Sequence, residues 1–149
     1  MPNWKKVIVS GSNAELNSLT LTSDLTVTGS LSVTGSAVIE GDLSIYSSLL
    51  SYQENLDVDT GTETIASVAT SDYDSAFFDF VIKNSTNLRA GTVYAIHDGT
   101  NVEYVETSTQ DLGNTSDVTL AVDISGGDLR LRATTTADNW VIKSLVRGL

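Results

Sequence analysis

A single histidine is the one side chain in this sequence that could act as a general base near neutral pH. His97 is the only histidine, and an unperturbed imidazole titrates at about pH 6.5. A serine hydrolase would need this base beside a nucleophile, and the sequence contains no G-x-S-x-G elbow or other nucleophile signature. Because His97 ends the alternating segment TVYAIH beside Asp98-Gly99, we expect it to stabilise a turn or to lie on the surface rather than to catalyse a reaction.

Two pairs of carboxylates are the next candidates for a catalytic or metal site. Asp57 with Asp59, and Asp72 with Asp74, are each two residues apart. Calcium loops add a glycine and a terminal glutamate that these segments lack. A glycosidase needs two carboxylates that face each other across a cleft. We therefore expect solvated loops, with no catalytic residue, no metal site and no cofactor.

Aromatic side chains form a third group, because they can stack on sugar rings. We expect most of them in a core or at a subunit interface, with a glycan-binding surface as the alternative. They are Tyr46, Tyr52, Tyr73, Tyr94, Tyr104 and Trp140.

Charge and composition exclude several classes of protein. The formal net charge is −11 and the eight basic residues are scattered, whereas a nucleic-acid binder needs a basic face. The chain has no cysteine, which excludes disulfides and thiolate metal sites. No apolar run is long enough for a signal peptide or a membrane span of about 20 residues. We expect synthesis in a cytoplasm, without a cleaved leader and without membrane insertion.

The elements that position these residues begin with a six-residue repeat over residues 19–48. Its units, here called hexads, are LTLTSD, LTVTGS, LSVTGS, AVIEGD and LSIYSS. Residues at positions one and three of a hexad point to the same side of a strand. The small or polar residues that follow allow the chain to turn a corner. The apolar positions are Leu19, Leu21, Leu25, Val27, Leu31, Val33, Ala37, Ile39, Leu43 and Ile45.

This repeat predicts a stalk made by three chains. A single-chain β-helix needs about three hexads per turn, so this repeat would build fewer than two turns and could not bury a continuous core. A lone chain would leave much of the apolar stripe in water, and sister chains would cover it. We therefore expect a homotrimeric β-prism or β-helix stalk, whose trimer core is formed by these apolar positions other than Ala37. Ordinary strands of a monomeric β-domain are the alternative.

The segments on either side of the repeat are predicted to be connections. Residues 1–18 would be an anchor that fits a larger assembly, or a cap that closes the end of the stalk. Residues 49–60 would be a neck, because Ile45, Leu49, Tyr52 and Leu56 fit one short heptad seam; an irregular linker would serve equally. The candidate anchor residues are Trp4, Lys5, Lys6 and Val7.

Residues 61–149 predict an antiparallel β-sandwich head of the jelly-roll kind. Asp98-Gly99 and Gly126-Gly127 separate alternating segments and predict hairpins. Trp140 and Ile142 begin the last strand. Arg130 and Arg132 share a strand face, where we expect ion pairs between subunits. Three apolar faces are predicted: Ala76, Phe78, Phe80 and Ile82; Val118, Leu120, Val122 and Ile124; Leu129, Leu131 and Ala133.

The head resembles a domain that recurs in structural proteins of marine tailed bacteriophages, including cyanophages. The segments that carry this resemblance are ETIASVATSDYDSAFFDFVIKN, AIHDGTNVEYVET, DVTLAVDISGGDLRLRAT and WVIKSLVRG, roughly residues 63–148. The opening MPNWKKVIVSGSNAEL, followed by L-x-V-T-G-S hexads, also resembles the start of such virion proteins. No family catalytic residues can be carried over, because the resemblance implies an architectural or adhesive role.

The resemblance implies a virion structural protein, made in the cytoplasm of the bacterial host. We expect a short homotrimeric fibre or spike, attached to the tail, neck or capsid and displaying the head. Its partners would be its own copies, other virion proteins and a host surface glycan, with no nucleic acid and no membrane. The alternatives are a trimeric capsid decoration protein, a glycan-binding adhesin and a hydrolase.

Overall fold

The computed structural model describes residues 20–149, and within that range the chain is all-β. One sheet has six strands in the order β1-β2-β9-β4-β5-β6, and the other has three in the order β3-β8-β7. All neighbouring strands are antiparallel. The strands are β1 (Leu43–Ile45), β2 (Ser48–Val58), β3 (Gly61–Ala69), β4 (Ser75–Asn84), β5 (Asn87–His97), β6 (Val102–Ser108), β7 (Val118–Ser125), β8 (Asp128–Thr135) and β9 (Trp140–Gly148).

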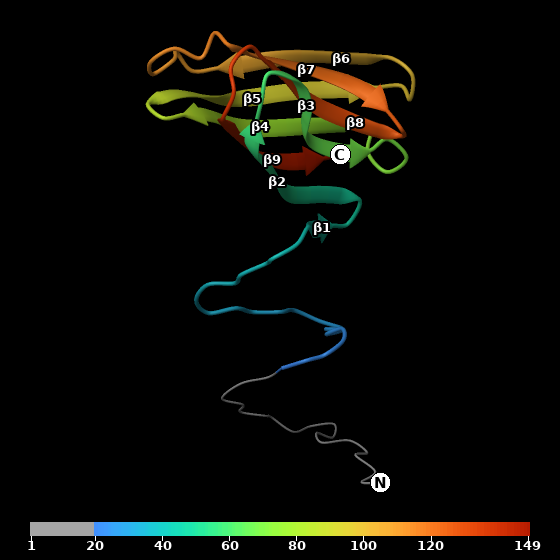
Figure 1. The fold of residues 1–149 in the computed structure, drawn as a ribbon. Coiled ribbons are helices and arrows are strands. Elements are labelled where there is room, and N and C mark those ends of the chain that lie inside the picture. The colour runs from blue at the N-terminus through green and yellow to red at the C-terminus, as the bar shows by residue number, and fades with distance from the viewer. Residues whose placement is uncertain (1–19) are drawn as a thin grey trace, which may run out of the picture. The chain divides into compact units, whose positions relative to one another are not determined.

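The two sheets pack face to face as a β-sandwich (Figure 1). Residues 38–149 form one compact unit, and residues 20–37 lie outside it. Phe78 and Ile82 from β4 and Leu131 from β8 are fully buried in a single cluster that also contains Trp140. The predicted sandwich is therefore confirmed, and one core joins both sheets.

The strand faces predicted from the alternating pattern are confirmed. The four even-numbered residues of β4, from Ala76 to Ile82, are buried. On β8, Leu129, Leu131 and Ala133 are buried, whereas Arg130 and Arg132 lie on the opposite face. The last strand begins at Trp140, as predicted.

Both predicted hairpins form. Gly126 and Gly127 connect β7 to β8 with φ angles of 65° and 89°; two successive positive angles define a type I′ turn, which glycine adopts without strain. At the β5–β6 turn, the Asp98 carboxylate accepts hydrogen bonds from the amides of Thr100 and Asn101 at 2.9 and 2.7 Å. Hydrogen bonds from Asn101, first its amide and then its side chain, lower the pKa of Asp98 to about 2.

The predicted neck at 49–60 is wrong, because most of it is strand β2. β2 pairs with β9 over nearly its whole length, and Ser51 is buried. Leu49 packs against the core, while the next residue, Leu50, lies on the other side of the sheet. Side chains that alternate in this way follow the period of a strand and not the heptad seam that the apolar spacing suggested.

The head also begins earlier and has a different strand order than predicted. Its sheet starts with β1, at the fifth hexad, rather than at residue 61. A two-residue turn at Tyr46 and Ser47, with a φ of 59° at Tyr46, joins β1 to β2. Strands β4, β5 and β6 form a meander within the larger sheet, and the sheets are unequal. A jelly roll instead has eight strands arranged as two Greek keys.

Within the described part of the repeat, only the fifth hexad contains a strand. Residues 20–42 form neither helix nor strand. A strand needs a neighbour for its backbone N–H and C=O groups, and β1 finds one in β2, whereas a single chain offers none to the earlier hexads. Leu19, the segment 1–18 and the candidate anchor residues Trp4, Lys5, Lys6 and Val7 lie outside the described residues. No helix among residues 20–149 is long and apolar enough to cross a membrane.

Candidate functional site

The apolar positions of the hexads are exposed to solvent in the single chain. Leu25 is 61% exposed, Leu31 is 68% exposed and Ile39 is 55% exposed. Leu43 is half-buried, because its strand joins the head. The other described trimer-core candidates, Leu21, Val27, Val33 and Ile45, are also exposed. The chain's own fold therefore leaves the stripe predicted for association uncovered.

A second exposed apolar surface lies on the larger sheet. We call the side of this sheet that is turned away from the three-stranded sheet its outer face. On β4 the inward residues are apolar, yet Phe77 and Val81 on the outer face are apolar too. The neighbouring strands add further exposed residues to this face, namely Tyr52, Tyr94, Ile96, Val105 and Leu145. A sheet face that meets water normally carries polar residues, so this face has the composition of one that is covered.

Three side chains of the outer face are packed into one another. The rings of Phe77 and Tyr94 meet edge to face, with centroids 5.5 Å apart and an interplanar angle of 90°. The guanidinium of Arg147 lies 4.9 Å from the centroid of Phe77, and its Nε is 3.2 Å from Oδ2 of Asp79. Aromatic and cation–π contacts of this kind hold their side chains in fixed positions. The centre of the outer face is therefore an ordered surface.

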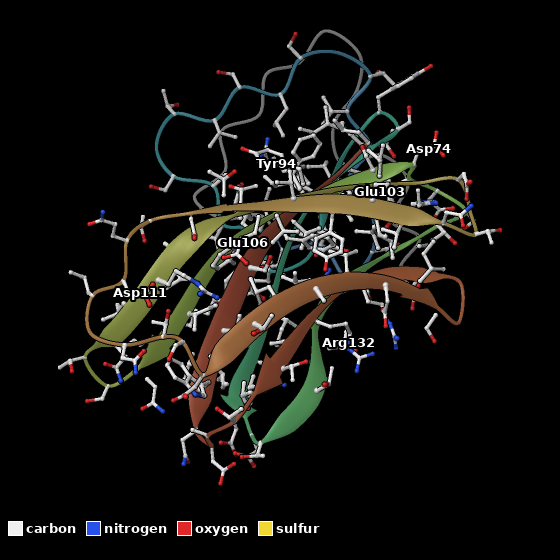
Figure 2. All side chains as sticks on the ribbon, turned by 90° about the horizontal axis from the view of Figure 1, so that it is seen from above. Asp74, Tyr94, Glu103, Glu106, Asp111 and Arg132 are labelled. Carbon is white, nitrogen blue, oxygen red and sulfur yellow. The ribbon has the colours of Figure 1, made fainter. Side chains whose placement is uncertain are left out.

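A groove of about 350 Å³ opens at the β5–β6 side of the outer face. Its charged residue is Glu103, and Figure 2 shows Tyr94 and Glu103 on the side of β5 and β6 that is turned away from β7. A tyrosine ring such as that of Tyr94 can stack on a sugar, and a carboxylate such as that of Glu103 can accept hydrogen bonds from its hydroxyl groups. The lining residues are Phe77, Tyr94, Ala95, Ile96, Glu103, Tyr104 and Val105.

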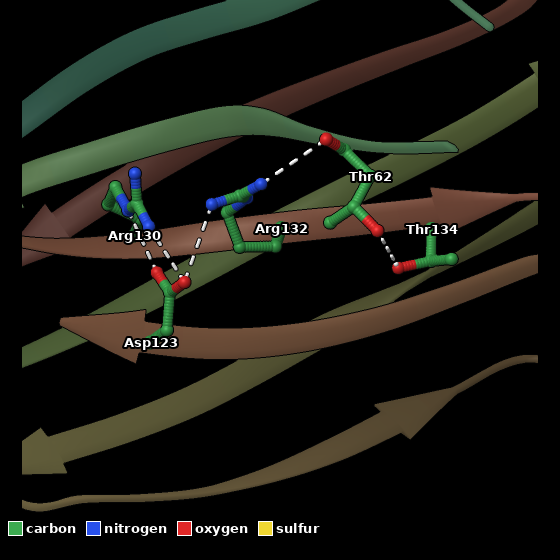
Figure 3. A network of polar contacts seen from close by, with 5 residues as sticks. All are labelled: Thr62, Asp123, Arg130, Arg132 and Thr134. Carbon is green, nitrogen blue, oxygen red and sulfur yellow. Dashed lines mark hydrogen bonds and ion pairs between the residues drawn. The ribbon is translucent and has the colours of Figure 1, made fainter. Parts of the chain in front are cut away.

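The outer face of the smaller sheet is polar and makes its ion pairs within one chain. Arg130 donates to both carboxylate oxygens of Asp123, with Nε–Oδ1 and Nη2–Oδ2 distances of 2.8 and 2.7 Å. Arg132 donates to the same carboxylate at 3.4 Å and to the carbonyl of Thr62 at 3.2 Å (Figure 3). The hydrogen bond from Arg130 lowers the pKa of Asp123. The ion pairs predicted between subunits are therefore intrachain pairs, because β7 places Asp123 directly opposite Arg130.

His97 holds a turn, as predicted. Its Nδ1 accepts a hydrogen bond from the amide of Gly99 at 3.0 Å, so its Nε2 carries the proton and donates to the carbonyl of Tyr73 at 2.7 Å. Both ring nitrogens are therefore engaged with backbone groups. The histidine links the β5–β6 turn to the loop before β4.

Of the paired acids, Asp57 is an exposed residue of strand β2, and Asp59, Asp72 and Asp74 lie in turns and loops. Asp59 accepts a hydrogen bond from the amide of Asn139 at 3.3 Å, between the end of β2 and the start of β9. Asp72 accepts one from the neighbouring Ser71 hydroxyl at 2.9 Å. In the part of the chain that the structure describes, no three His, Cys, Asp or Glu side chains gather closely enough to hold a metal ion.

The structure separates the aromatic candidates into three environments. Trp140 is buried in the core, and Tyr73 packs against that core. Tyr46 is fully exposed at the β1–β2 turn. The remaining three are exposed on the larger sheet: Tyr52 and Tyr94 lie on its outer face, whereas Tyr104 pairs with the buried residue Ala95 and lies on the opposite side of β6.

Sequence reasoning missed Phe77 and Val81, although the sequence contained a signal for them. The segment SAFFDFVI has apolar residues at odd as well as even positions. Strands buried on both faces have such continuous apolar runs, whereas a strand with one wet face alternates. Phe77 and Val81 could therefore have been found from this one segment.

Comparison with known protein families finds no family model that matches the chain, and comparison with curated proteins finds no match.

Proposed function

We propose that this protein is a structural component of a bacteriophage virion. It would be a short homotrimeric fibre or spike, attached to the tail, neck or capsid and displaying its β-sandwich head. The observation that carries this proposal is the exposure of the hexad positions. Leu25 and Leu31 are each more than half exposed in the single chain, and the same arrangement recurs through five consecutive hexads.

The energetics of this stripe favour association. Full burial of a Leu or Val side chain contributes about 1.5–3 kcal/mol, and a single chain gains little of this from the repeat. Three chains wound together would cover the stripe and would also supply backbone partners to residues 20–42. The head needs no such help, because it has its own core from both sheets. A stalk that requires sister chains and a head that folds by itself is the arrangement expected of a fibre.

The acidic character of the chain fits a protein displayed on a particle. A formal charge of −11 keeps such a surface soluble and opposes non-specific binding to nucleic acid. In this proposal the N-terminal segment docks on the particle through Trp4, Lys5, Lys6 and Val7, and the protein carries out no catalytic step and needs no cofactor.

The test of this function is to look for the chain in purified phage particles. Mass spectrometry of particles from the phage that encodes it should detect the chain, and gold-labelled antibodies against the head should mark one position on the particle. A copy number in the hundreds would indicate a capsid decoration protein, and a few trimers would indicate a tail or neck appendage. Particles of full infectivity that contain none of the chain would contradict the proposal.

The groove with the Tyr94 ring and the Glu103 carboxylate favours a second candidate function, in which the head binds a host glycan. Incubating the full chain with an array of bacterial surface glycans tests it. Binding that is lost in Tyr94→Ala and kept in Thr119→Ala, on the outer face of the smaller sheet, would support it. Absence of binding to every glycan of the host surface would remove it.

A further inference from the structure

The fifth hexad continues into the outer face of the larger sheet. Leu43, at position one of this hexad, pairs with Leu50. Leu50 pairs with Arg147, Arg147 with Phe77, and Phe77 with Tyr94. Residues directly opposite each other on antiparallel strands lie on the same side of a sheet. The apolar position of the repeat is therefore in register with the aromatic centre of the outer face.

This face is also more apolar than its counterpart on the smaller sheet. Ile96 is 62% exposed and Val105 is 56% exposed, whereas the outer face of the smaller sheet presents Thr119, Arg130 and Arg132. Exposed apolar surface of this extent marks an interaction site on a soluble protein. The sandwich therefore has one face suited to water and one suited to a partner.

The charges on the outer face balance one another. Nζ of Lys143 lies 3.4 Å from Oε2 of Glu54, and Nε of Arg147 lies 3.2 Å from Oδ2 of Asp79. The two other charged side chains at outward positions on the paired strands are Lys83 and Glu103. Three positive and three negative groups balance at these regularly paired positions, with Asp57 in the β2 bulge at the margin, on a chain whose net charge is −11. Copies of an acidic chain repel each other least where their surfaces are neutral, so this face is where they can meet.

We propose that the outer face of the larger sheet packs against a second copy of this chain. This inference rests on the proposed function, because it extends the threefold association of the hexads into the head. Leu43 and Ile45 belong both to the repeat and to the larger sheet, so the surface that faces sister chains in the repeat continues across β1, β2, β9 and β4. The polar face of the smaller sheet then points outward to solvent.

Single-cysteine variants of the full chain test this, because the natural sequence contains no cysteine. Leu145→Cys places a thiol at an exposed position of the outer face, on the central strand β9. Thr119→Cys is the matched control at an exposed position of the opposite face. Each variant is labelled with a maleimide that carries a polyethylene glycol chain, and its mass is measured by light scattering. Both are repeated in a Val33→Asp background, where the repeat cannot associate.

The expected result is a trimer in which Leu145→Cys reacts at least tenfold more slowly than Thr119→Cys. If Val33→Asp dissociates the assembly, the two rates should become similar. Continued protection in a Val33→Asp variant that stays trimeric would also support the inference, since the heads would then hold one another. A trimer whose two thiols react equally fast would overturn it and leave the proposed fibre intact. So would a Leu145→Cys thiol that is protected only after a glycan is added. A chain that is monomeric at all concentrations would overturn both proposals.

Discussion

Leu43 and Leu50 lie opposite each other in the short antiparallel pair of β1 and β2. Leu43 is the first residue of the fifth hexad, and Leu50 belongs to a strand that pairs with β9 inside the head. The repeat therefore ends within the sandwich and not before it. The boundaries of the folding unit follow from this arrangement, and so do the predictions below about its stability and the proposed association.

The head should fold as residues 38–149 and not as residues 60–149. The shorter fragment lacks β1 and β2, so β9 keeps β4 as a neighbour but loses β2 and becomes an edge strand. Trp140 also loses its cross-strand partner, the buried residue Val58. We expect the longer fragment to show a cooperative thermal transition and the shorter one to aggregate or to melt at a much lower temperature. Circular dichroism of both fragments measures this, and equal melting temperatures would contradict the assignment of β2.

Gly91 should tolerate no larger residue. A Cβ at this position would contact the carbonyl oxygen of Thr107, and it would lie 2.8 Å from Cα of Ser108 and 3.0 Å from Cζ of Phe80. Two of these are backbone atoms held by the β5–β6 ladder, so Gly91→Ala should lower the free energy of unfolding by about 1–3 kcal/mol. Urea unfolding followed by tryptophan fluorescence measures the change. Gly41→Ala is the control, because a Cβ there meets nothing within 4 Å; an equal loss in both variants would refute the packing argument.

Asp123→Asn should destabilise the head in a pH-dependent way. The Asp123 side chain is 44% exposed, so solvent screening limits the expected loss to about 0.5–1 kcal/mol at pH 7. Because Arg130 lowers the pKa of Asp123 in the folded state, the carboxylate stabilises the fold above its ordinary pKa of 3.8. That contribution disappears as the pH falls through the lowered pKa.

Urea unfolding of the wild type and of Asp123→Asn at about pH 7 and at about pH 2.5 measures this dependence. The difference between the two proteins should shrink at the lower pH. Asp57→Asn is a matched control, since it removes one charge from an exposed strand residue whose carboxylate makes no hydrogen bond within residues 20–149. A difference that grows on acidification would show that the ion pair does not stabilise the head.

Val33→Asp should dissociate the assembly and leave the head folded. In a trimer it would bring three carboxylates together in an apolar core, at a cost of several kcal/mol. Ser32→Asp is the control, because it adds the same charge at position two of the same hexad. The side chain at that position points to the other side of a strand from Val33. Light scattering should give a single chain for Val33→Asp and three chains for Ser32→Asp. If both variants kept the mass of the wild type, the hexads would not be the surface of association.

The sequence predicted the head well where its strands alternate. The buried sets of β4, β7 and β8 and both hairpin turns follow from period-two patterns and from glycine and aspartate at turns. The groove residues Tyr94 and Tyr104 were also among the aromatic candidates. These features could be predicted from local sequence because each depends mainly on residues that are close together in the chain.

The strand order and the role of β2 could not be predicted from such signals. In LLSYQENLDV the apolar residues fit a heptad as well as a strand, and only the pairing with β9, about 90 residues later, decides between them. The intrachain pair of Arg130 and Asp123 similarly depends on the register of β7 with β8. Side-chain contacts between distant segments are set by register, which the composition of one segment does not determine.

The mass of the purified full-length chain in solution tests the central claim most directly. Light scattering across a range of concentrations should give three times the 15.8 kDa of one chain. A folded protein with the mass of one chain at every concentration would contradict the account.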